Sequence, residues 1–191
     1  MSVVIHEVCH GYAAEALGDP TARYAGRLSL NPLKHLDPIG SVIVPIMLSL
    51  IPPYMVFGWA KPVPVNPYNL KSQRWGEALV ALAGPASNFA VALFFGLLIR
   101  FNVTGDFLSD SFLRITASLV FINLLLAVFN LVPVPPLDGS KILFGLLPQH
   151  SFAAQNWIER HSLVLFLFFV FFLWKFVDPA IGLLFRLITG V

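Results

Sequence analysis

The sequence predicts an all-α protein that crosses a membrane several times. Hydrophobic residues make up 57% of the 191 residues, charged residues only 12%, and the mean hydropathy is +0.78. An ordinary soluble domain has about a quarter charged residues. Two apolar stretches, residues 78–99 and 112–132, reach the length of about 20 residues that a helix needs to cross a hydrocarbon core. A Phe-rich stretch at 162–188 predicts one further C-terminal span.

The N-terminal third predicts a less regular set of elements. Residues 1–17 predict a helix that ends at Gly18-Asp19-Pro20, because glycine and proline both interrupt helices. Residues 18–38 are polar, whereas 39–57 are apolar but contain three prolines. Residues 58–67 hold three more prolines among alternating valines, which favours an extended backbone over a helix.

The first predicted helix contains an HExxH run, His6-Glu7-Val8-Cys9-His10. On a helix the two histidines face the same way about one turn apart, so that both imidazoles can bind one zinc ion. Glu7 then lies beside the open position of the metal, where it can act as a general base. We therefore expect one Zn²⁺ per chain and metal-dependent hydrolysis. Cys9 is the only cysteine, which excludes a site built on several thiolates.

Asp138 is the best candidate for the third protein ligand that a catalytic zinc requires. Glu15 is nearer in the sequence, but it would lie about 140° around the helix from His10. Asp138 follows the 112–132 stretch, and a carboxylate beside hydrocarbon is costly unless it is paired or binds a metal. The alternative is that Asp138 is a solvated loop residue.

Four motifs in this order resemble the site-2 protease family of intramembrane zinc metalloproteases, in a compact form without a PDZ-like or CBS-like domain. The resemblance covers residues 1 to about 145. Its motifs are HExxH, the Gly58–Pro67 loop, GP-x-x-N at Gly84–Asn88, and N-x-x-P-x-x-P-L-D-G at Asn130–Gly139. Each motif alone is moderate support for the family, and their common order makes the resemblance specific.

The resemblance implies the roles of five residues and the kind of substrate. It makes His6, His10 and Asp138 the zinc ligands and Glu7 the general base. Asn130 becomes a polar group near the scissile carbonyl. The expected reaction is hydrolysis of peptide bonds in membrane-embedded protein substrates, so a transmembrane substrate protein and the lipid bilayer are the expected partners.

Other classes of function are weaker fits to the sequence. A zinc-bearing scaffold without proteolysis would have no use for Glu7 as a base. A metal transporter would need ionisable residues along several spans, and 78–99 and 112–132 hold almost none. The formal charge of +2 is too small to suggest a nucleic-acid partner. The sequence gives no indication of the oligomeric state.

A common site for His6, His10 and Asp138 constrains the topology. If residues 39–57 crossed the bilayer completely, Asp138 would lie about 30 Å from the histidines, on the opposite face. The prolines allow a re-entrant segment at about 39–67 that enters the membrane and returns, provided that it packs against protein. We therefore expect a core of three spanning helices around the zinc site, a re-entrant Pro-rich segment, and one C-terminal span.

Charge distribution supports this topology and predicts its orientation. The side that bears the site would hold eight basic residues and the other side only Arg100 and Arg114. The eight are Arg23, Arg27, Lys34, Lys61, Lys71, Arg74, Lys141 and Arg160. By the positive-inside rule, we expect a multi-pass protein of a prokaryotic plasma membrane with the zinc site toward the cytoplasm.

The length of 191 residues predicts a single integral membrane domain, with a core at 1–145 and the extra C-terminal span at 162–188. The HExxH run lies only five residues from the start of the sequence, which suggests upstream sequence and leaves open whether that sequence includes a helix. The sequence does not identify the substrate or the signal that triggers cleavage.

Overall fold

The computed structural model describes residues 1–50, 58–102, 109–148 and 151–191, and these residues form helices and connecting segments without a strand. The α-helices are α1 (Ser2–Ala16), α2 (Thr21–Tyr24), α3 (Val44–Leu50), α4 (Gln73–Asn102), α5 (Asp110–Asn130), α6 (Asp138–Leu146), α7 (Phe152–Arg160), α8 (Ser162–Phe168) and α9 (Trp174–Thr189). Short 3-10 or π segments are η1 (Pro32–His35), η2 (Pro38–Ile43), η3 (Pro67–Asn69) and η4 (Phe169–Leu173).

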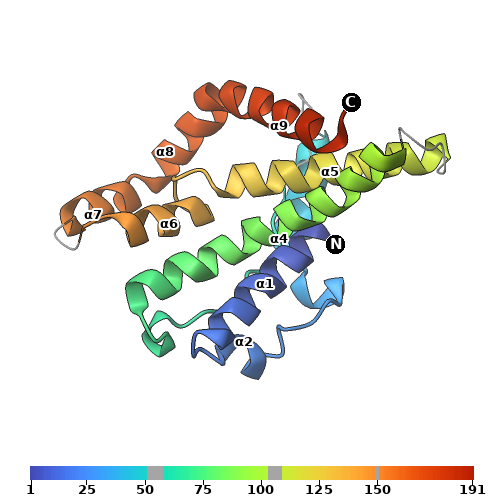
Figure 1. Ribbon diagram of the computed structural model, residues 1–191. Coiled ribbons are helices and arrows are strands. Elements are labelled where there is room, and N and C mark those ends of the chain that lie inside the picture. The colour runs from blue at the N-terminus through green and yellow to red at the C-terminus, as the bar shows by residue number, and fades with distance from the viewer. Residues whose placement is uncertain (51–57, 103–108, 149–150) are drawn as a thin grey trace.

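Helix α4 is the centre of the arrangement. It packs against α1 on one side and against α5, α6 and α9 elsewhere along its length (Figure 1). Pro85 lies inside α4 and is buried. A proline inside a helix removes one backbone hydrogen bond, and in a membrane protein such a residue is tolerated where neighbouring helices pack closely.

Among the described residues, three helices are long and apolar enough to cross a membrane: Trp75–Asn102, Asp110–Asn130 and Ser162–Thr189. Pro38–Leu50 is a shorter apolar helix. These elements confirm the expected all-α membrane protein with a Pro-rich apolar segment. Helix α1 has 15 residues, fewer than the about 20 needed for a span.

A hydrophobic core joins α4 and α5 to the C-terminal helices. Ala92 and Ile99 of α4 pack with Val120 and Leu124 of α5 and with buried residues of η4 and α9. The outer faces expose large apolar side chains: Phe94, Ile115, Phe171 and Phe176 are 61–75% exposed. Such surfaces need an apolar solvent, and the helix lengths indicate that this solvent is the bilayer. The C-terminal helix turns between α8 and α9, where η4 replaces α-helix (Figure 1).

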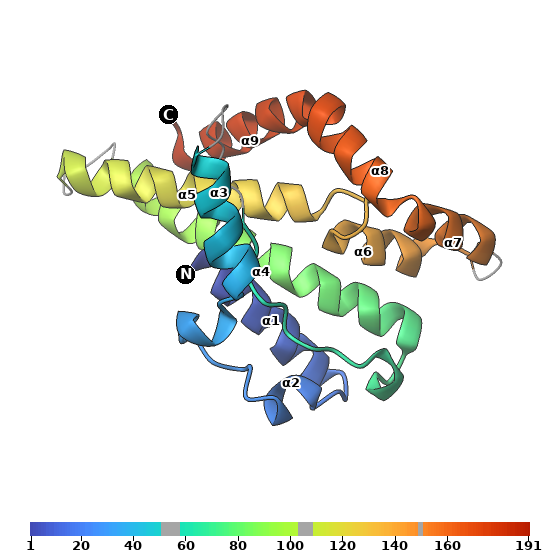
Figure 2. The same cartoon turned by 180° about the vertical axis from the view of Figure 1, so that it is seen from behind.

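The two ends of the segment predicted to be re-entrant lie side by side. Helix α3 crosses in front of α4 and α5 in the view of Figure 2, residues 51–57 of the segment lie outside the described residues, and the returning chain passes α1. Trp59 N–H donates to the Gly40 carbonyl at 3.1 Å, and the Ser41 hydroxyl donates to the Trp59 carbonyl at 2.8 Å. Residues 58–66 contain no helix, as their prolines predict.

Candidate active site

Helix α1 presents His6 and His10 on the face that packs against α4. Both side chains are buried, and their Nε2 atoms lie 3.0 Å apart. Helix α1 ends where Gly18 adopts a positive φ of 110°, as the Gly-Asp-Pro sequence predicts. The spacing of four residues on a regular helix therefore brings the two imidazoles to one point.

Asp138 is the first residue of α6 and brings a carboxylate to the same point. Its Oδ2 lies 3.1 Å from His6 Nε2 and 3.2 Å from His10 Nε2. The three ligand atoms lie within 4.8 Å of one another, and 132 residues of sequence separate His6 from Asp138. The long apolar helices thus bring together the three residues that the sequence singles out as candidate ligands.

Hydrogen bonds to the Nδ1 atoms of His6 and His10 determine that the Nε2 atom of each imidazole faces Asp138. His6 Nδ1 lies 2.6 Å from Asn88 Oδ1, and His10 Nδ1 lies 2.7 Å from the Val80 carbonyl. Both partners are acceptors, so each Nδ1 carries the proton and each Nε2 presents a lone pair. This arrangement is the usual outer support of metal-binding histidines.

The donor set fits zinc. Two bare imidazole nitrogens and a carboxylate oxygen, about 3 Å apart, repel one another unless a cation lies between them. Ligand atoms bound at about 2.0–2.1 Å in a tetrahedron would lie roughly 3.3–3.4 Å apart, close to the distances here. Three protein ligands also leave a fourth position open, as a catalytic rather than a structural zinc site requires.

Two glycines allow the backbone to approach the site. A Cβ at Gly84 of α4 would lie 2.4 Å from His10 Nε2 and 2.6 Å from His6 Nε2, so any side chain there would displace the ligands. A Cβ at Gly139 would lie 2.3 Å from the carbonyl oxygens of Leu131 and Val132. Glycine after Asp138 therefore lets α6 start directly against the end of α5.

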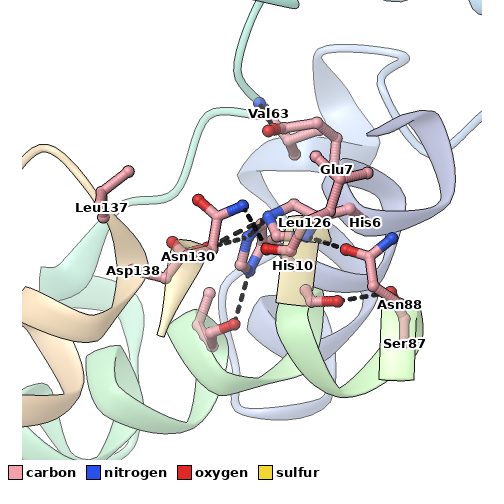
Figure 3. A network of polar contacts seen from close by, with 12 residues as sticks. His6, Glu7, His10, Val63, Ser87, Asn88, Leu126, Asn130, Leu137 and Asp138 are labelled. Carbon is pink, nitrogen blue, oxygen red and sulfur yellow. Dashed lines mark hydrogen bonds and ion pairs between the residues drawn. The ribbon is translucent and has the colours of Figure 1, made fainter. Parts of the chain in front are cut away.

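The carboxylate of Glu7 is hydrogen-bonded to the extended segment formed by residues 58–66. Its Oε2 accepts a hydrogen bond of 2.9 Å from the backbone N–H of Val63 (Figure 3). This bond orients the carboxylate and leaves its other oxygen to accept a proton. The sequence predicts Glu7 beside the metal, but nothing in it identifies Val63 as the partner.

His6, Glu7, His10 and Asp138 share a cavity of about 270 Å³. Asn130 at the end of α5 also lines this cavity, and its amide nitrogen donates to the Leu126 carbonyl at 2.9 Å. The remaining walls come from the extended segment, α4 and α6. They include Val63, Val65, Glu77, Val80 and Lys141.

Asn88 is a site residue whose contact with a candidate zinc ligand the sequence did not identify. The GP-x-x-N motif marks the residue, and an interhelical hydrogen bond or a place in the substrate site are the two roles that its position predicts. The structure shows the first of these roles: Asn88 is fully buried, and its side-chain oxygen accepts a hydrogen bond from His6 of α1. Its Nδ2 donates to Asn123 Oδ1 at 3.0 Å and to the Ser2 carbonyl at 3.3 Å. Only the long-range packing of α1, α4 and α5 creates this network.

Comparison with known proteins finds relatives of this chain by sequence. The model of peptidase family M50 matches residues 101–173, which include Asn130 and Asp138. YwhC of Bacillus subtilis, provisionally named a zinc metalloprotease, is 39% identical over 175 residues, covering 87% of this chain and 75% of that protein. No solved structure matches the chain.

Other relatives are longer than the chain. Rip2 of Mycolicibacterium smegmatis, also provisionally named a zinc metalloprotease, is 32% identical over 78% of this chain and 54% of that protein. Zinc metalloprotease MJ0392 of Methanocaldococcus jannaschii is 27% identical over 77% of this chain and 32% of its own length. The chain thus spans about half of the mycobacterial relative. With three helices apolar enough to span a membrane and this extent of identity to YwhC, the chain belongs to the zinc metalloproteases of peptidase family M50.

Proposed function

We propose that this chain hydrolyses peptide bonds of membrane-embedded protein substrates, with His6, His10 and Asp138 as the zinc ligands. One observation carries the proposal: the three ligand atoms, the Glu7 carboxylate and Asn130 face a single cavity among helices apolar enough to span a bilayer. Peptide hydrolysis inside a membrane needs a site that admits water but is shielded from lipid.

The residues divide the chemistry between them. Zinc, when bound, supplies a Lewis acid that polarises the scissile carbonyl and lowers the pKa of a bound water. Glu7 takes the proton from the attacking water through its free oxygen and later passes it to the leaving amine. Asn130 lines the same cavity and positions the scissile carbonyl through its side-chain amide.

The extended segment beside Glu7 is suited to hold an unwound stretch of substrate. A helical substrate must first expose its peptide bond, since its carbonyls are already hydrogen-bonded within the helix. Val63 N–H is engaged by Glu7 and Asn66 N–H by Asp19, whereas Val65 N–H has no partner within the described residues. Pro62, Pro64 and Pro67 have no N–H. A substrate that adds to this segment as a strand can therefore form backbone hydrogen bonds only over a short stretch around Val65.

The proposed orientation places the cavity toward the cytoplasm of a prokaryotic cell, in its plasma membrane. Among residues 1–160, eight basic residues lie on the proposed site side against two on the other, which is the asymmetry of the positive-inside rule. The relatives named above come from bacteria and an archaeon.

Cleavage of a defined membrane substrate tests the proposal. The chain and a single-pass substrate protein are reconstituted together in vesicles, and the products are located by mass spectrometry. Cuts within the apolar segment of the substrate, absent with Glu7→Gln, are the expected result. Cuts confined to soluble tails would overturn the membrane-embedded substrate, and zinc binding without any cleavage would favour a zinc-bearing scaffold.

A further inference from the structure

A second pocket lies behind the extended segment, on the side away from the active-site cavity. It has a volume of about 550 Å³ and is lined by Arg27, Lys34 and Lys61 together with Pro62 and Pro64. Side chains alternate between the two sides of an extended backbone, so Val63 and Val65 face the active-site cavity while Pro64 faces this cationic pocket. Pro62 lines both.

The walls of the cationic pocket are fixed by backbone contacts. The Arg27 guanidinium donates to the Lys34 carbonyl and, at 3.3 and 3.4 Å, to the Lys61 and Pro62 carbonyls. Lys61 N–H donates to the His35 carbonyl at 2.9 Å, and the buried His35 ring bonds the Ser29 carbonyl at 2.8 Å. These bonds join the loop that holds Lys34 to the extended segment that holds Lys61.

The lining of the pocket carries a net positive charge, which no carboxylate of the described residues neutralises. Lys34 and Lys61 are both exposed, and neither forms an ion pair with a carboxylate in the part of the chain that the structure describes. No Asp or Glu is among the lining residues. Two ammonium groups on one rigid rim are therefore available to an anion.

Exposed apolar side chains adjoin these cations. Leu30, Leu33, Leu36 and Ile39 belong to the same loop and its continuation, and they are 46–72% exposed. Lysines next to exposed leucines, at the start of an apolar helix, form the pattern of a surface that lies at the membrane interface, with leucines toward acyl chains and ammonium groups toward headgroups.

We propose that the cationic pocket binds the phosphate of an anionic phospholipid headgroup, while Leu30, Leu33, Leu36 and Ile39 dip into the acyl boundary. Lipid bound there would hold the extended segment at Lys61 and Pro62, directly before Val63, whose N–H donates to Glu7. The inference requires membrane insertion but not proteolysis, so it can fail or succeed independently of the proposed activity.

Lipid retention by the purified full chain tests this site. Native mass spectrometry from detergent, with phosphatidylglycerol and phosphatidylcholine in equal amounts, measures the affinity for each lipid. The site predicts preferential retention of phosphatidylglycerol and a loss of about fivefold for each of Lys34→Gln and Lys61→Gln. Lys71→Gln/Lys175→Gln, which removes two charges elsewhere, is the matched control and should retain the lipid.

Three outcomes would overturn the proposal. The first is equal retention of the two lipids, and the second is an equal loss in the control double variant. The third is displacement of the lipid by millimolar inorganic phosphate or by an acidic peptide, which would assign the pocket to a soluble ligand. Unchanged thermal unfolding of Lys34→Gln, of Lys61→Gln and of the control double variant shows that the substitutions act on binding and not on folding.

Discussion

His6 and His10 differ from ordinary buried histidines in what their Nδ1 atoms contact. Each Nδ1 bonds an acceptor on α4, Asn88 Oδ1 or the Val80 carbonyl, and so each Nε2 is left to face Asp138. The second of these acceptors is backbone, which a substitution of Val80 cannot remove. Asn88 is therefore the residue through which this support can be tested.

Asn88→Ala should weaken zinc binding by about 10- to 100-fold, because His6 loses the acceptor that fixes its tautomer and its orientation. Titration with a competing chelator measures the affinity. Asn123→Ala is the control: it removes a neighbour of Asn88 but leaves the 2.6 Å contact between His6 and Asn88 in place. An equal loss in both variants would mean that the network acts only through packing of the helices.

Gly84→Ala should also lower zinc affinity, by at least about tenfold, since the added methyl group would lie within 2.6 Å of both Nε2 atoms. Ala86 is exposed on the same helix, so Ala86→Val adds bulk away from the site and should bind zinc normally. Metal content after dialysis against a weak chelator separates the two variants. Full zinc occupancy of Gly84→Ala would show that α4 can move away at little cost.

At the scale of single residues, the sequence predicts contacts within one helical turn but not contacts between residues that are far apart in the sequence. The spacing of His6, Glu7 and His10 on one helix is enough to predict a metal site. Asp138 follows from the cost of a carboxylate beside hydrocarbon, together with the family resemblance. The contact between His6 and Asn88 joins residues 82 positions apart, and no local pattern contains it.

The extended segment at 58–66 contacts both helix α1 and the turn that follows it. Its lack of helix follows from Pro62, Pro64 and the flanking Pro67, and this was predictable. Its partners were not, because they come from other elements: Val63 bonds Glu7 of α1, and Asn66 N–H donates to Asp19 Oδ2 at 2.6 Å.

Asp19 accepts a hydrogen bond from Asn66 at the end of this segment, and its contribution to the stability of the fold should depend on pH. Burial opposes its charge, but hydrogen bonds from Thr21, Asn69 and Asn66 outweigh the burial and hold the pKa of the Asp19 carboxyl below its usual 3.8. A carboxyl with a lowered folded-state pKa contributes stability above about pH 4, and this contribution is lost as the pH falls through the folded-state value.

Asp19→Asn should therefore lower stability by about 1–3 kcal/mol at pH 7, and the difference from the natural chain should shrink below about pH 4. Thermal unfolding in detergent between pH 7 and pH 3 measures both effects. Subtracting the two curves removes the other carboxylates, which titrate equally in both chains. A difference that stays constant down to pH 3 would contradict the assignment of the pKa shift to Asp19.

At the scale of the whole molecule, length and apolarity were enough to predict three of the long elements. The structure places them at Trp75–Asn102, Asp110–Asn130 and Ser162–Thr189, with ends within three residues of the predicted 78–99, 112–132 and 162–188. The turn between α8 and α9 was not predictable, because the Phe-rich sequence is uniformly apolar and holds no local signal for the π segment η4.

Orientation in the membrane follows from the charge asymmetry and can be measured with single cysteines. In a Cys9→Ser background, Ser72→Cys lies on the proposed cytoplasmic side and Ser111→Cys on the opposite side. A membrane-impermeant thiol reagent added to intact cells should label position 111 and not position 72, with the reverse in inverted vesicles. Labelling of position 72 from outside would reverse the proposed orientation and place the site away from the cytoplasm.

The central claim is that His6, His10 and Asp138 hold one zinc ion at which Glu7 acts as the base. The most direct test measures zinc content and substrate cleavage on the same purified samples of the natural chain, Glu7→Gln and Asp138→Ala. We predict one zinc per chain in the first two, cleavage in the natural chain alone, and zinc largely lost from Asp138→Ala. Well-folded natural chain without zinc, or undiminished cleavage by Glu7→Gln, would contradict the claim.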